Sequence, residues 1–305
     1  MYKVFIDGSA GTTGLKIVQR LSTRKDITLI TLREELRKDV EARKKAINSA
    51  DVVFLCLPDV ASKEAISLIE NKNVKVIDTS TAFRVDDDWV YGFSELGFKD
   101  KIAKSNKIAN PGCHASGFIA LIKPLIDNKI LSSNVKLTCF SLTGYSGGGK
   151  KMIAEYEDDN RDALLGGARQ YALTQNHKHL PEMTKISGLT TPPIFCPIVC
   201  DYDCGMEVTV PLFYSDVNGS IDDIKNVYKN TYNGKIVKYV EETENGFLSS
   251  NALSGKDGMQ ISVHGNNERI LLISRFDNLG KGASGAAIQN MNILLNLDET
   301  TGLDL

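Results

Sequence analysis

The sequence predicts an α/β protein with two domains, one built on a parallel sheet and one on a mixed, largely antiparallel sheet. About the first hundred residues alternate short apolar runs with amphipathic stretches, which is typical of a parallel sheet covered by helices on both faces. From about residue 134 the apolar runs lengthen and alternate with polar residues, as strands with one solvated face do. The 305-residue chain is long enough to bury two such cores.

The elements follow in order along the chain. The first domain has five short apolar runs that predict strands, at residues 2–8, 27–32, 51–58, 74–80 and 107–110. The charge-rich stretch 32–46 predicts a helix with a solvated face. The second domain has four longer runs that predict strands, at residues 135–144, 205–214, 259–265 and 269–277. Residues 280–297 return to helical spacing, and we expect this helix to pack back on the first domain.

Composition excludes several classes of function. A net charge of −2 provides no basic field for nucleic acid, and no apolar run approaches the roughly 18 residues of a membrane span. The first strand begins almost at Met1, which leaves no room for a signal peptide. Six cysteines without an export signal then favour reduced thiols and a cytoplasmic protein. The spacing of Cys196, Cys200 and Cys204 is longer than that of zinc hooks, so we expect strand or loop cysteines and no metal.

A glycine-rich loop follows the first predicted strand and opens a helix. It contains Gly8, Gly11 and Gly14, separated by Ser9, Thr12 and Thr13 among others. Backbone amides in such a loop can bind a pyrophosphate at the helix N-terminus, so the loop is a candidate dinucleotide site. The spacing G-x-x-G-x-x-G differs from the usual G-x-G-x-x-G, and a tight turn without a ligand is the alternative.

The end of the second strand indicates which dinucleotide is bound. An acidic residue there reads the ribose 2′-hydroxyl of NAD, whereas an arginine suits the 2′-phosphate of NADP. Arg33 comes first in this sequence, which favours NADP, and Glu34 and Glu35 follow directly.

Cys113 is the candidate nucleophile. It follows Asn110, Pro111 and Gly112, which favour a turn, and the apolar spacing after it predicts a helix. Unpaired N–H groups and the helix dipole favour a thiolate at such a position. The alternative is a small buried hydrophobic residue, the common fate of a free cysteine.

Three further stretches are candidates for the same site. His177 and His179 precede Pro181, and a helix beginning there brings Glu182 within reach of an imidazole, as in a general acid or base. The alternative is a pair of surface histidines. Ser80 and Arg84 follow the fourth strand, at the sheet edge where ligands collect. A glycine run carries Ser146, Gly147 and Lys150, and suits either close approach to a ligand or a mobile hairpin tip.

Taken together, the motifs resemble those of the N-acetyl-γ-glutamyl-phosphate reductases of arginine biosynthesis, particularly the shorter form. The stretches GSAGTTG, DTSTAFR, NPGCHASG, SGGGKKM, HKHLPEM and DNLGKGASGAAIQNMN occur in the order of that family, over essentially the whole chain. The resemblance implies an oxidoreductase that uses NADPH to reduce N-acetyl-γ-glutamyl phosphate to the semialdehyde through a thioester on Cys113. It also implies His179 and Glu182 as catalytic residues, and His177, Arg84 and Lys150 as substrate contacts.

The same resemblance implies a semialdehyde dehydrogenase-like fold and a homo-oligomer. A Rossmann-type parallel sheet domain would comprise residues 1–112 and 280–305, and a catalytic and oligomerisation domain residues 113–279. Asn278 and Lys281 of the tail motif join Ser80, Ser146 and Gly147 as expected cofactor contacts. Two alternatives are an aspartate-semialdehyde dehydrogenase, whose pocket needs an acid for the substrate ammonium, and a non-catalytic NADP-binding regulator, which would be expected to lack the nucleophile or the base.

Overall fold

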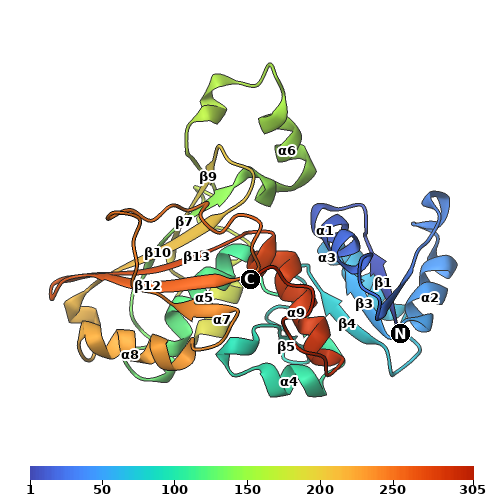
Figure 1. Ribbon diagram of the computed structural model, residues 1–305, viewed down its shortest axis with the longest axis horizontal. Helices are drawn as coiled ribbons and strands as arrows, with labels where there is room; N and C mark the ends of the chain where they lie inside the picture. Colours follow the sequence, from blue (N-terminus) through green and yellow to red (C-terminus); the bar gives the residue numbers. More distant parts are fainter. The chain divides into compact units, whose positions relative to one another are not determined.

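The computed structural model describes all residues, 1–305, as two compact units (Figure 1). Unit 1 comprises Met1–Pro111 and Ala283–Leu303, and unit 2 comprises Gly112–Gly282 with Asp304–Leu305. The chain therefore leaves unit 1 directly before Gly112 and returns to it at Ala283. The sequence places these boundaries at residues 112 and 280.

Unit 1 contains a six-stranded sheet in which every neighbouring pair is parallel, in the order β2-β1-β3-β4-β6-β5. Its strands are β1 (Tyr2–Asp7), β2 (Ile27–Ile30), β3 (Val52–Leu55), β4 (Lys75–Asp78), β5 (Val90–Tyr91) and β6 (Lys107–Ala109). Five of these strands confirm the sequence prediction. The two-residue β5 is too short to give a periodic signal.

Helices cover both faces of this sheet. The helical segments of unit 1 are α1 (Thr12–Leu21), η1 (Glu34–Leu36), α2 (Val40–Ser49), α3 (Asp59–Ser67), η2 (Ser94–Leu96), α4 (Lys99–Lys104) and α9 (Gly285–Leu294). Alternate strand residues separate two cores: Val4 and Phe54 pack with α1, α4 and α9, whereas Phe5 and Val53 pack with α2 and α3. The predicted doubly covered sheet is confirmed.

The C-terminal helix α9 completes the first core, as the sequence predicts. Ile288 and Met291 are fully buried against strand residues such as Val4 and Ile77. The Lys75 ammonium donates a hydrogen bond of 2.7 Å to the Leu294 carbonyl at the end of the helix. A segment distant in sequence thus belongs to the core of unit 1.

Unit 2 contains a seven-stranded mixed sheet in the order β11-β12-β13-β10-β7-β9-β8. Its strands are β7 (Thr138–Gly144), β8 (Arg169–Gln170), β9 (Ile194–Cys200), β10 (Met206–Phe213), β11 (Val237–Tyr239), β12 (Met259–Gly265) and β13 (Arg269–Phe276). Pairs β7–β9 and β11–β12 are parallel and the other four are antiparallel. The four long predicted strands are confirmed, and Cys196 and Cys200 lie in β9, with Cys204 in the loop that follows.

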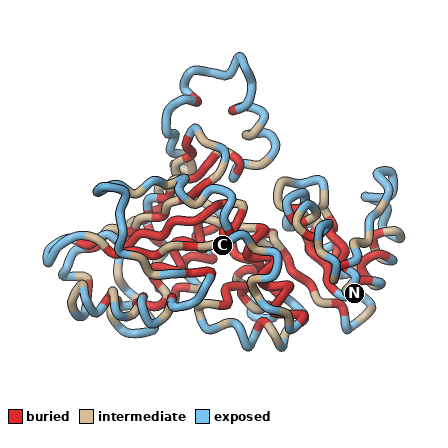
Figure 2. Tube along the Cα trace, in the orientation of Figure 1, coloured by how far each residue is buried: buried red, intermediate tan, exposed pale blue.

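One face of this sheet carries helices (Figure 1). The helical segments of unit 2 are α5 (Cys113–Asp127), η3 (Tyr145–Gly148), α6 (Gly149–Glu157), η4 (Ala163–Gly166), α7 (Leu180–Ser187), η5 (Tyr214–Asp216), α8 (Ile221–Thr231) and the π-turn η6 (Gly280–Ser284), which runs into unit 1. Helix α5 packs on β10 and β13, with α7 and α8 beside it. The segment from α6 to η4 projects beyond the strands and is largely exposed, whereas the strands are buried along much of their length (Figure 2).

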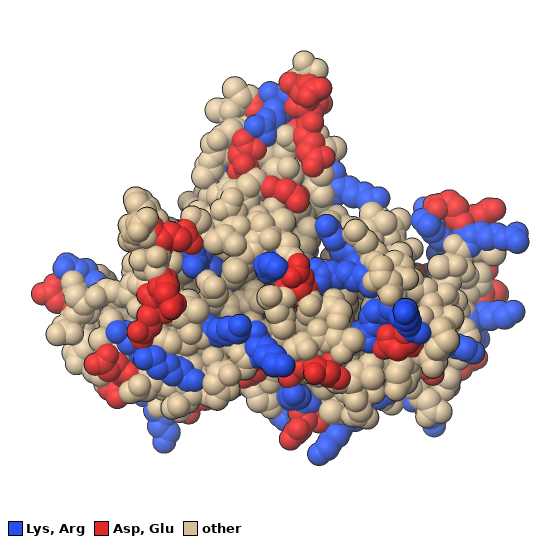
Figure 3. Space-filling view, in the orientation of Figure 1, with Lys and Arg blue, Asp and Glu red and all other residues tan.

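The surface carries acidic and basic side chains side by side over the face drawn in Figure 3. The projecting segment has several acidic residues around the end of α6, among them Glu157 and Asp158. None of the helices combines the length and the apolar character that a membrane crossing requires.

Candidate active site

The glycine loop after β1 has the strand–turn–helix geometry that the sequence predicts. Helix α1 begins at Thr12, and its N-cap residue Gly11 offers no side chain to cap the first amides. Gly8 has a φ of +85°, and a Cβ atom there would collide with the carbonyl oxygen of Cys56. A Cβ atom on Gly14 would lie 2.5 Å from the carbonyl oxygen of Gly8. These contacts explain glycine at both positions, and the uncapped amides can bind an anion.

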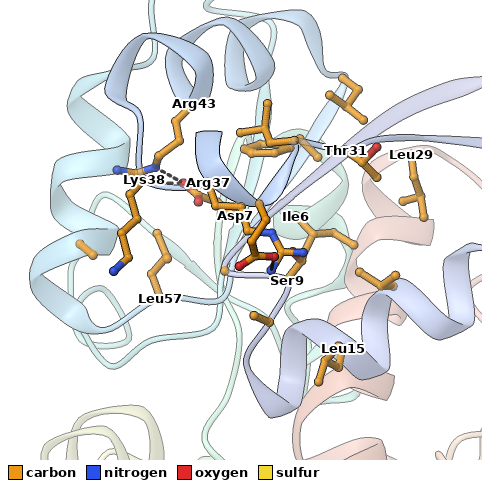
Figure 4. Close-up of a pocket in the computed structure, with 18 of the residues that line it drawn as sticks. Ile6, Asp7, Ser9, Leu15, Leu29, Thr31, Arg37, Lys38, Arg43 and Leu57 are labelled. Carbon is orange, nitrogen blue, oxygen red and sulfur yellow. Dashed lines mark hydrogen bonds and ion pairs between the residues drawn. The ribbon is translucent and has the colours of Figure 1, made fainter.

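A cavity of about 720 Å³ opens beside this loop (Figure 4). Its apolar walls come from β1, β2, α1 and the loop after β3, and include Ile6, Leu15, Leu29 and Leu57. Ser9 lines the same cavity, whereas Thr12 and Thr13 are the first residues of α1. A concave site of this size, with apolar walls and a charged rim, suits a nucleotide.

The charged rim of the cavity differs from the arrangement that Arg33 alone suggests. Arg33 is exposed at the N-cap of η1 and does not line the cavity. Arg37 and Lys38, which follow the same 3-10 turn, do line it (Figure 4). Glu34 and Glu35 line it as well. One guanidinium nitrogen of Arg37 lies 2.7 Å from a Glu34 carboxylate oxygen. The turn η1 thus places the side chains of Arg37 and Lys38, and not that of Arg33, at the cavity.

A buried ion pair that sequence reasoning missed supports the floor of the cavity. Arg43 donates two hydrogen bonds to one carboxylate oxygen of Asp7, at 3.1 and 3.0 Å, and a third of 3.2 Å to Glu64. Burial raises the pKa of Asp7, and the bonds from Arg43 oppose this shift. The expectation of one solvated helix over 32–46 is therefore wrong: η1 and α2 are separate, and Arg43 of α2 is buried.

Ser80 and Arg84 follow β4 and are both buried. The Ser80 hydroxyl donates a 2.7 Å hydrogen bond to Asp78, whose pKa burial raises. Arg84 donates to the carbonyl oxygens of Asn110 and Thr79, each at 2.9 Å. Both of these hydrogen bonds go from the guanidinium to backbone carbonyl groups, so Arg84 stabilises the turn that leads to Cys113.

Cys113 is the first residue of helix α5, which confirms the predicted helix start. Its N-cap is Gly112, and the N–H of Gly112 donates a 2.8 Å hydrogen bond to the buried carboxylate of Glu182. The backbone of Gly282 approaches closely, because a Cβ atom there would lie 3.0 Å from the Cβ of Cys113. The turn before the cysteine is therefore fixed by a residue of α7.

The two histidines lie directly before α7, as expected from the helix start near Pro181. Their ring centroids are 4.8 Å apart, and the backbone N–H of His179 donates a 3.2 Å hydrogen bond to Nδ1 of His177. Burial lowers the pKa of His177 to about 4, with a smaller contribution from Lys178. Both rings lie 5.7 Å from the ring of His114, the neighbour of Cys113. Unit 2 thus gathers Cys113, His177, His179 and Glu182 around the start of α5.

A second set of predicted residues meets near the end of β7. The Asn278 amide donates a 3.0 Å hydrogen bond to the Ser146 hydroxyl, and its oxygen accepts one of 2.9 Å from the Gly205 N–H. Lys281 is buried in η6, whereas Gly147 and Lys150 are exposed. Sequence reasoning missed Tyr171, whose hydroxyl lies 2.7 Å from Nε2 of His114, because the two residues are far apart in the chain.

Comparisons with known proteins match both units. Residues 3–105 match the family described as semialdehyde dehydrogenase, NAD binding domain. Residues 113–278 match the semialdehyde dehydrogenase dimerisation domain.

Curated relatives and solved structures cover nearly the whole chain. The N-acetyl-gamma-glutamyl-phosphate reductase 2 of Nostoc sp. is 43% identical over 99% of both chains. The N-acetyl-gamma-glutamyl-phosphate reductase of Brucella ovis is 44% identical over 96% of this chain and 98% of its own. Aspartate semialdehyde dehydrogenase II of Vibrio cholerae, complexed with ASA, has a TM-score of 0.71 at 14% identity, covering 97% of this chain and 98% of its own. The Francisella tularensis enzyme has a TM-score of 0.71 at 15% identity, covering 97% and 100%.

Proposed function

The chain belongs to the family of N-acetyl-γ-glutamyl-phosphate reductases, and we propose that it reduces N-acetyl-γ-glutamyl phosphate to N-acetylglutamate 5-semialdehyde and phosphate in arginine biosynthesis. The observation that carries this proposal is Cys113 at the first position of α5, beside His177, His179 and Glu182. A nucleophile next to candidate acids and bases suits acyl transfer. The likeness to aspartate semialdehyde dehydrogenases, at 14–18% identity, supports the fold alone.

Cys113 acts as the nucleophile in this proposal. Its thiolate attacks the γ-acyl carbon, the carbon–oxygen bond to phosphate breaks, and the acyl group remains as a thioester. Backbone amides at the start of α5 stabilise the tetrahedral oxyanion. Because the nucleophile must stay a reduced thiol and none of the six cysteines forms a disulfide, a reducing compartment, the cytoplasm, suits this chemistry.

A nicotinamide dinucleotide, when bound, supplies the hydride that reduces the thioester carbon. The amides of the Gly8–Gly14 loop would hold its pyrophosphate and the adjoining cavity its adenosine. His179 protonates the oxygen of the resulting tetrahedral species and takes the proton back as the aldehyde forms and the thiolate leaves. We assign Ser80, Ser146, Gly147, Asn278 and Lys281 to cofactor contacts from the family resemblance.

The substrate contacts in the proposal are His177 and Lys150, and Arg84, which the family resemblance places near the substrate, positions the turn before Cys113. His177 is neutral at pH 7 because burial lowers its pKa to about 4, so it offers a hydrogen bond rather than a charge. Lys150 is exposed near the start of α6 and can bind the leaving phosphate. Arg84 contributes by holding Asn110 in the turn before Cys113.

The function is tested by assaying purified protein in the direction of aldehyde oxidation. Phosphate-dependent NADP reduction should occur with N-acetylglutamate 5-semialdehyde and not with aspartate semialdehyde. Cys113→Ser should abolish turnover and leave NADPH binding, measured by fluorescence titration, nearly intact, because a hydroxyl lacks thiolate character. Iodoacetamide should label Cys113 faster than the other five cysteines. Substantial activity of the Cys113→Ser variant would contradict a mechanism that proceeds through a thioester on Cys113.

The roles of His177 and His179 can be distinguished by how their substitution changes kcat and KM. His179→Asn should lower kcat by about 10²–10⁴-fold, the usual contribution of general acid–base catalysis. His177→Asn should instead raise KM more than it lowers kcat, as a substrate contact would. Glu182→Gln should cost less than His179→Asn, because the amide oxygen can still accept the Gly112 N–H. A larger kcat loss in His177→Asn than in His179→Asn would reverse the two roles.

We also propose NADPH as the preferred cofactor. Arg37 and Lys38 line the cavity and supply positive charge for a 2′-phosphate, with Glu34 and Glu35 between them and Arg33. The Arg37 guanidinium contacts only an exposed glutamate, so it can turn to a phosphate at little cost.

The cofactor proposal predicts different effects for two arginines of one turn. Arg37→Ala should weaken NADPH binding by about one to two decades, the loss of one charge-assisted hydrogen bond, and leave NADH binding nearly unchanged. Arg33→Ala is the matched control and should change the NADPH affinity less, because Arg33 lies outside the cavity lining. Isothermal titration with both dinucleotides measures this. A larger loss of NADPH affinity in Arg33→Ala than in Arg37→Ala would indicate that Arg33 binds the 2′-phosphate.

We propose that the chain forms a homo-oligomer through the helix-free face of the unit 2 sheet, since residues 113–278 match a dimerisation domain. Phe140, Ile194 and Leu271 are 40%, 60% and 40% exposed on this face, next to Pro211 and Cys196. A contiguous apolar face on a folded sheet marks an interaction surface.

Light scattering coupled to size exclusion tests this surface. Leu271→Glu should shift the mass toward the monomer at micromolar concentration, because it buries a charge in the contact. Leu164→Glu, on the projecting segment and 74% exposed, is the control and should keep the native mass. If the mass of the Leu271→Glu variant is unchanged, the subunit contact lies on another surface.

A further inference from the structure

Asp277 lies between β13 and η6 and accepts the hydrogen bonds of the first amides of that turn. Its carboxylate oxygen Oδ1 accepts the Leu279 N–H at 2.6 Å and the Gly280 N–H at 2.9 Å. Its backbone carbonyl accepts the Gly282 N–H at 2.9 Å, five residues along the chain, which is the bond of a π-turn. Because the first amides of a helical turn have no acceptor within it, Asp277 fixes how η6 begins.

The second carboxylate oxygen of Asp277 binds residues 253–258, a loop before β12 that is distant along the chain. Oδ2 accepts the Gly255 N–H at 2.5 Å. The backbone of the loop also touches η6, since a Cβ atom on Gly280 would lie 2.1 Å from the carbonyl oxygen of Lys256. Asp277 is 2% exposed, so its bonds are shielded from water. One buried side chain thus joins loop 253–258 to the turn.

The end of the chain also holds loop 253–258. The Asp257 N–H donates a 2.6 Å hydrogen bond to the Asp304 carbonyl, and the Asp304 N–H donates one of 2.8 Å to the Asp257 carboxylate. The Lys256 ammonium lies 2.7 Å from a carboxylate oxygen of Asp304. The loop therefore has anchors of its own, and Asp277 holds η6 against a fixed segment.

Two residues of the candidate active site depend on the position of η6. Asn278 directly follows Asp277, and its amide reaches the Ser146 hydroxyl. The backbone of Gly282 packs on Cys113, because a Cβ atom on Gly282 would lie 3.0 Å from the Cβ of Cys113. A displacement of η6 would therefore move the Asn278 amide and change the space around the Cys113 side chain.

We propose that Asp277 is a positioning residue for the reduction, which holds η6 between loop 253–258 and Cys113 and thereby places Asn278 for the cofactor. The inference rests on the proposed function, which gives Asn278 and Cys113 their roles. Asp277 acts through the backbone of η6 and needs no contact with the reacting atoms. A displacement of about 1 Å at a reacting group can lower a rate about 10²-fold, so a residue behind the turn can control kcat.

Steady-state kinetics and isothermal titration of two variants test this positioning role. Asp277→Ala removes all three side-chain bonds and should lower kcat about 10²-fold and weaken NADPH binding about tenfold. Asp277→Asn keeps one oxygen for Leu279 and Gly280 but places an N–H donor opposite the Gly255 N–H. It should therefore lower kcat by a smaller factor, about tenfold.

Asp216→Ala is the matched control. The Asp216 carboxylate accepts the Phe213 N–H at 3.0 Å at the start of η5, so this variant also removes an acceptor from a helical turn of unit 2. It should lower Tm and leave kcat and the NADPH affinity unchanged. If Asp277→Ala and Asp277→Asn likewise lower Tm alone, with kcat measured well below Tm, the residue is merely structural and the inference is wrong.

Hydrogen–deuterium exchange tests the two sets of bonds separately. Exchange of a peptide covering residues 253–258 should become faster in both variants, because both lose the Gly255 bond. Exchange at residues 279–282 should become faster in Asp277→Ala and stay near that of the wild type in Asp277→Asn. If Asp277→Ala does not fold, Asp277→Asn carries the test, and a wild-type kcat in that variant overturns the inference.

The outcomes separate this inference from the proposed function. If the wild-type protein is an active reductase, Cys113→Ser is inactive and both Asp277 variants keep the wild-type kcat, the inference is wrong and the proposed function stands. If Cys113→Ser retains activity, the proposed function is wrong, and the positioning role that rests on it falls as well, whatever the exchange of the Asp277 variants.

Discussion

The location of Cys113 depends on the hydrogen bonds of the turn that precedes it. The Asn110 N–H donates a 2.7 Å bond to Asp78, and its side chain binds the Ala283 carbonyl and the Asn290 amide. Two residues later, the Gly112 N–H reaches Glu182. Asp78, Asn110, Glu182 and Asn290 are buried, so a lost partner would leave a polar atom of theirs unsatisfied at a cost of about 1–3 kcal/mol. The turn is therefore rigid where the helix begins, and the first amides of α5 keep one direction relative to the sulfur.

A comparable constraint sets the nucleotide loop in unit 1. Gly8 directly follows Asp7, whose carboxylate is held by two bonds from Arg43. Breaking a buried pair of this kind by removing one partner costs about 3–5 kcal/mol, because the other charge is left uncompensated. The ion pair therefore fixes the end of β1, and the positive φ of Gly8 then turns the chain into α1. In both units a buried carboxylate, and not the ligand itself, fixes the backbone that would contact a ligand.

The parts of the site that sequence reasoning found are those with a local signal. The glycine loop, the helix start at Cys113 and the helix after His179 each follow from turn residues and periodicity within a few positions. The partners of these residues carry no local signal. Arg43 looks like one charge in a solvated stretch, and only the packing of α2 on β1 buries it against Asp7. The sequence predicts Glu182 beside an imidazole but gives no signal for its hydrogen bond to Gly112, which depends on how α7 packs on α5. Arg37 replaces Arg33 at the cavity because η1 turns the chain between them.

Burial also limits how this site can stabilise charge. A thiolate is often stabilised by a neighbouring imidazolium, but burial costs an imidazole hydration and lowers its pKa. His114 and His177 therefore serve as neutral hydrogen-bonding groups, with pKa values lowered to about 3 and about 4. Oriented dipoles can stabilise negative charge on the sulfur, and the amides of α5 are the nearest of these along the chain. Such dipoles are fixed before the reaction and need little reorganisation during it, so the same packing that neutralises the histidines also preorganises the site.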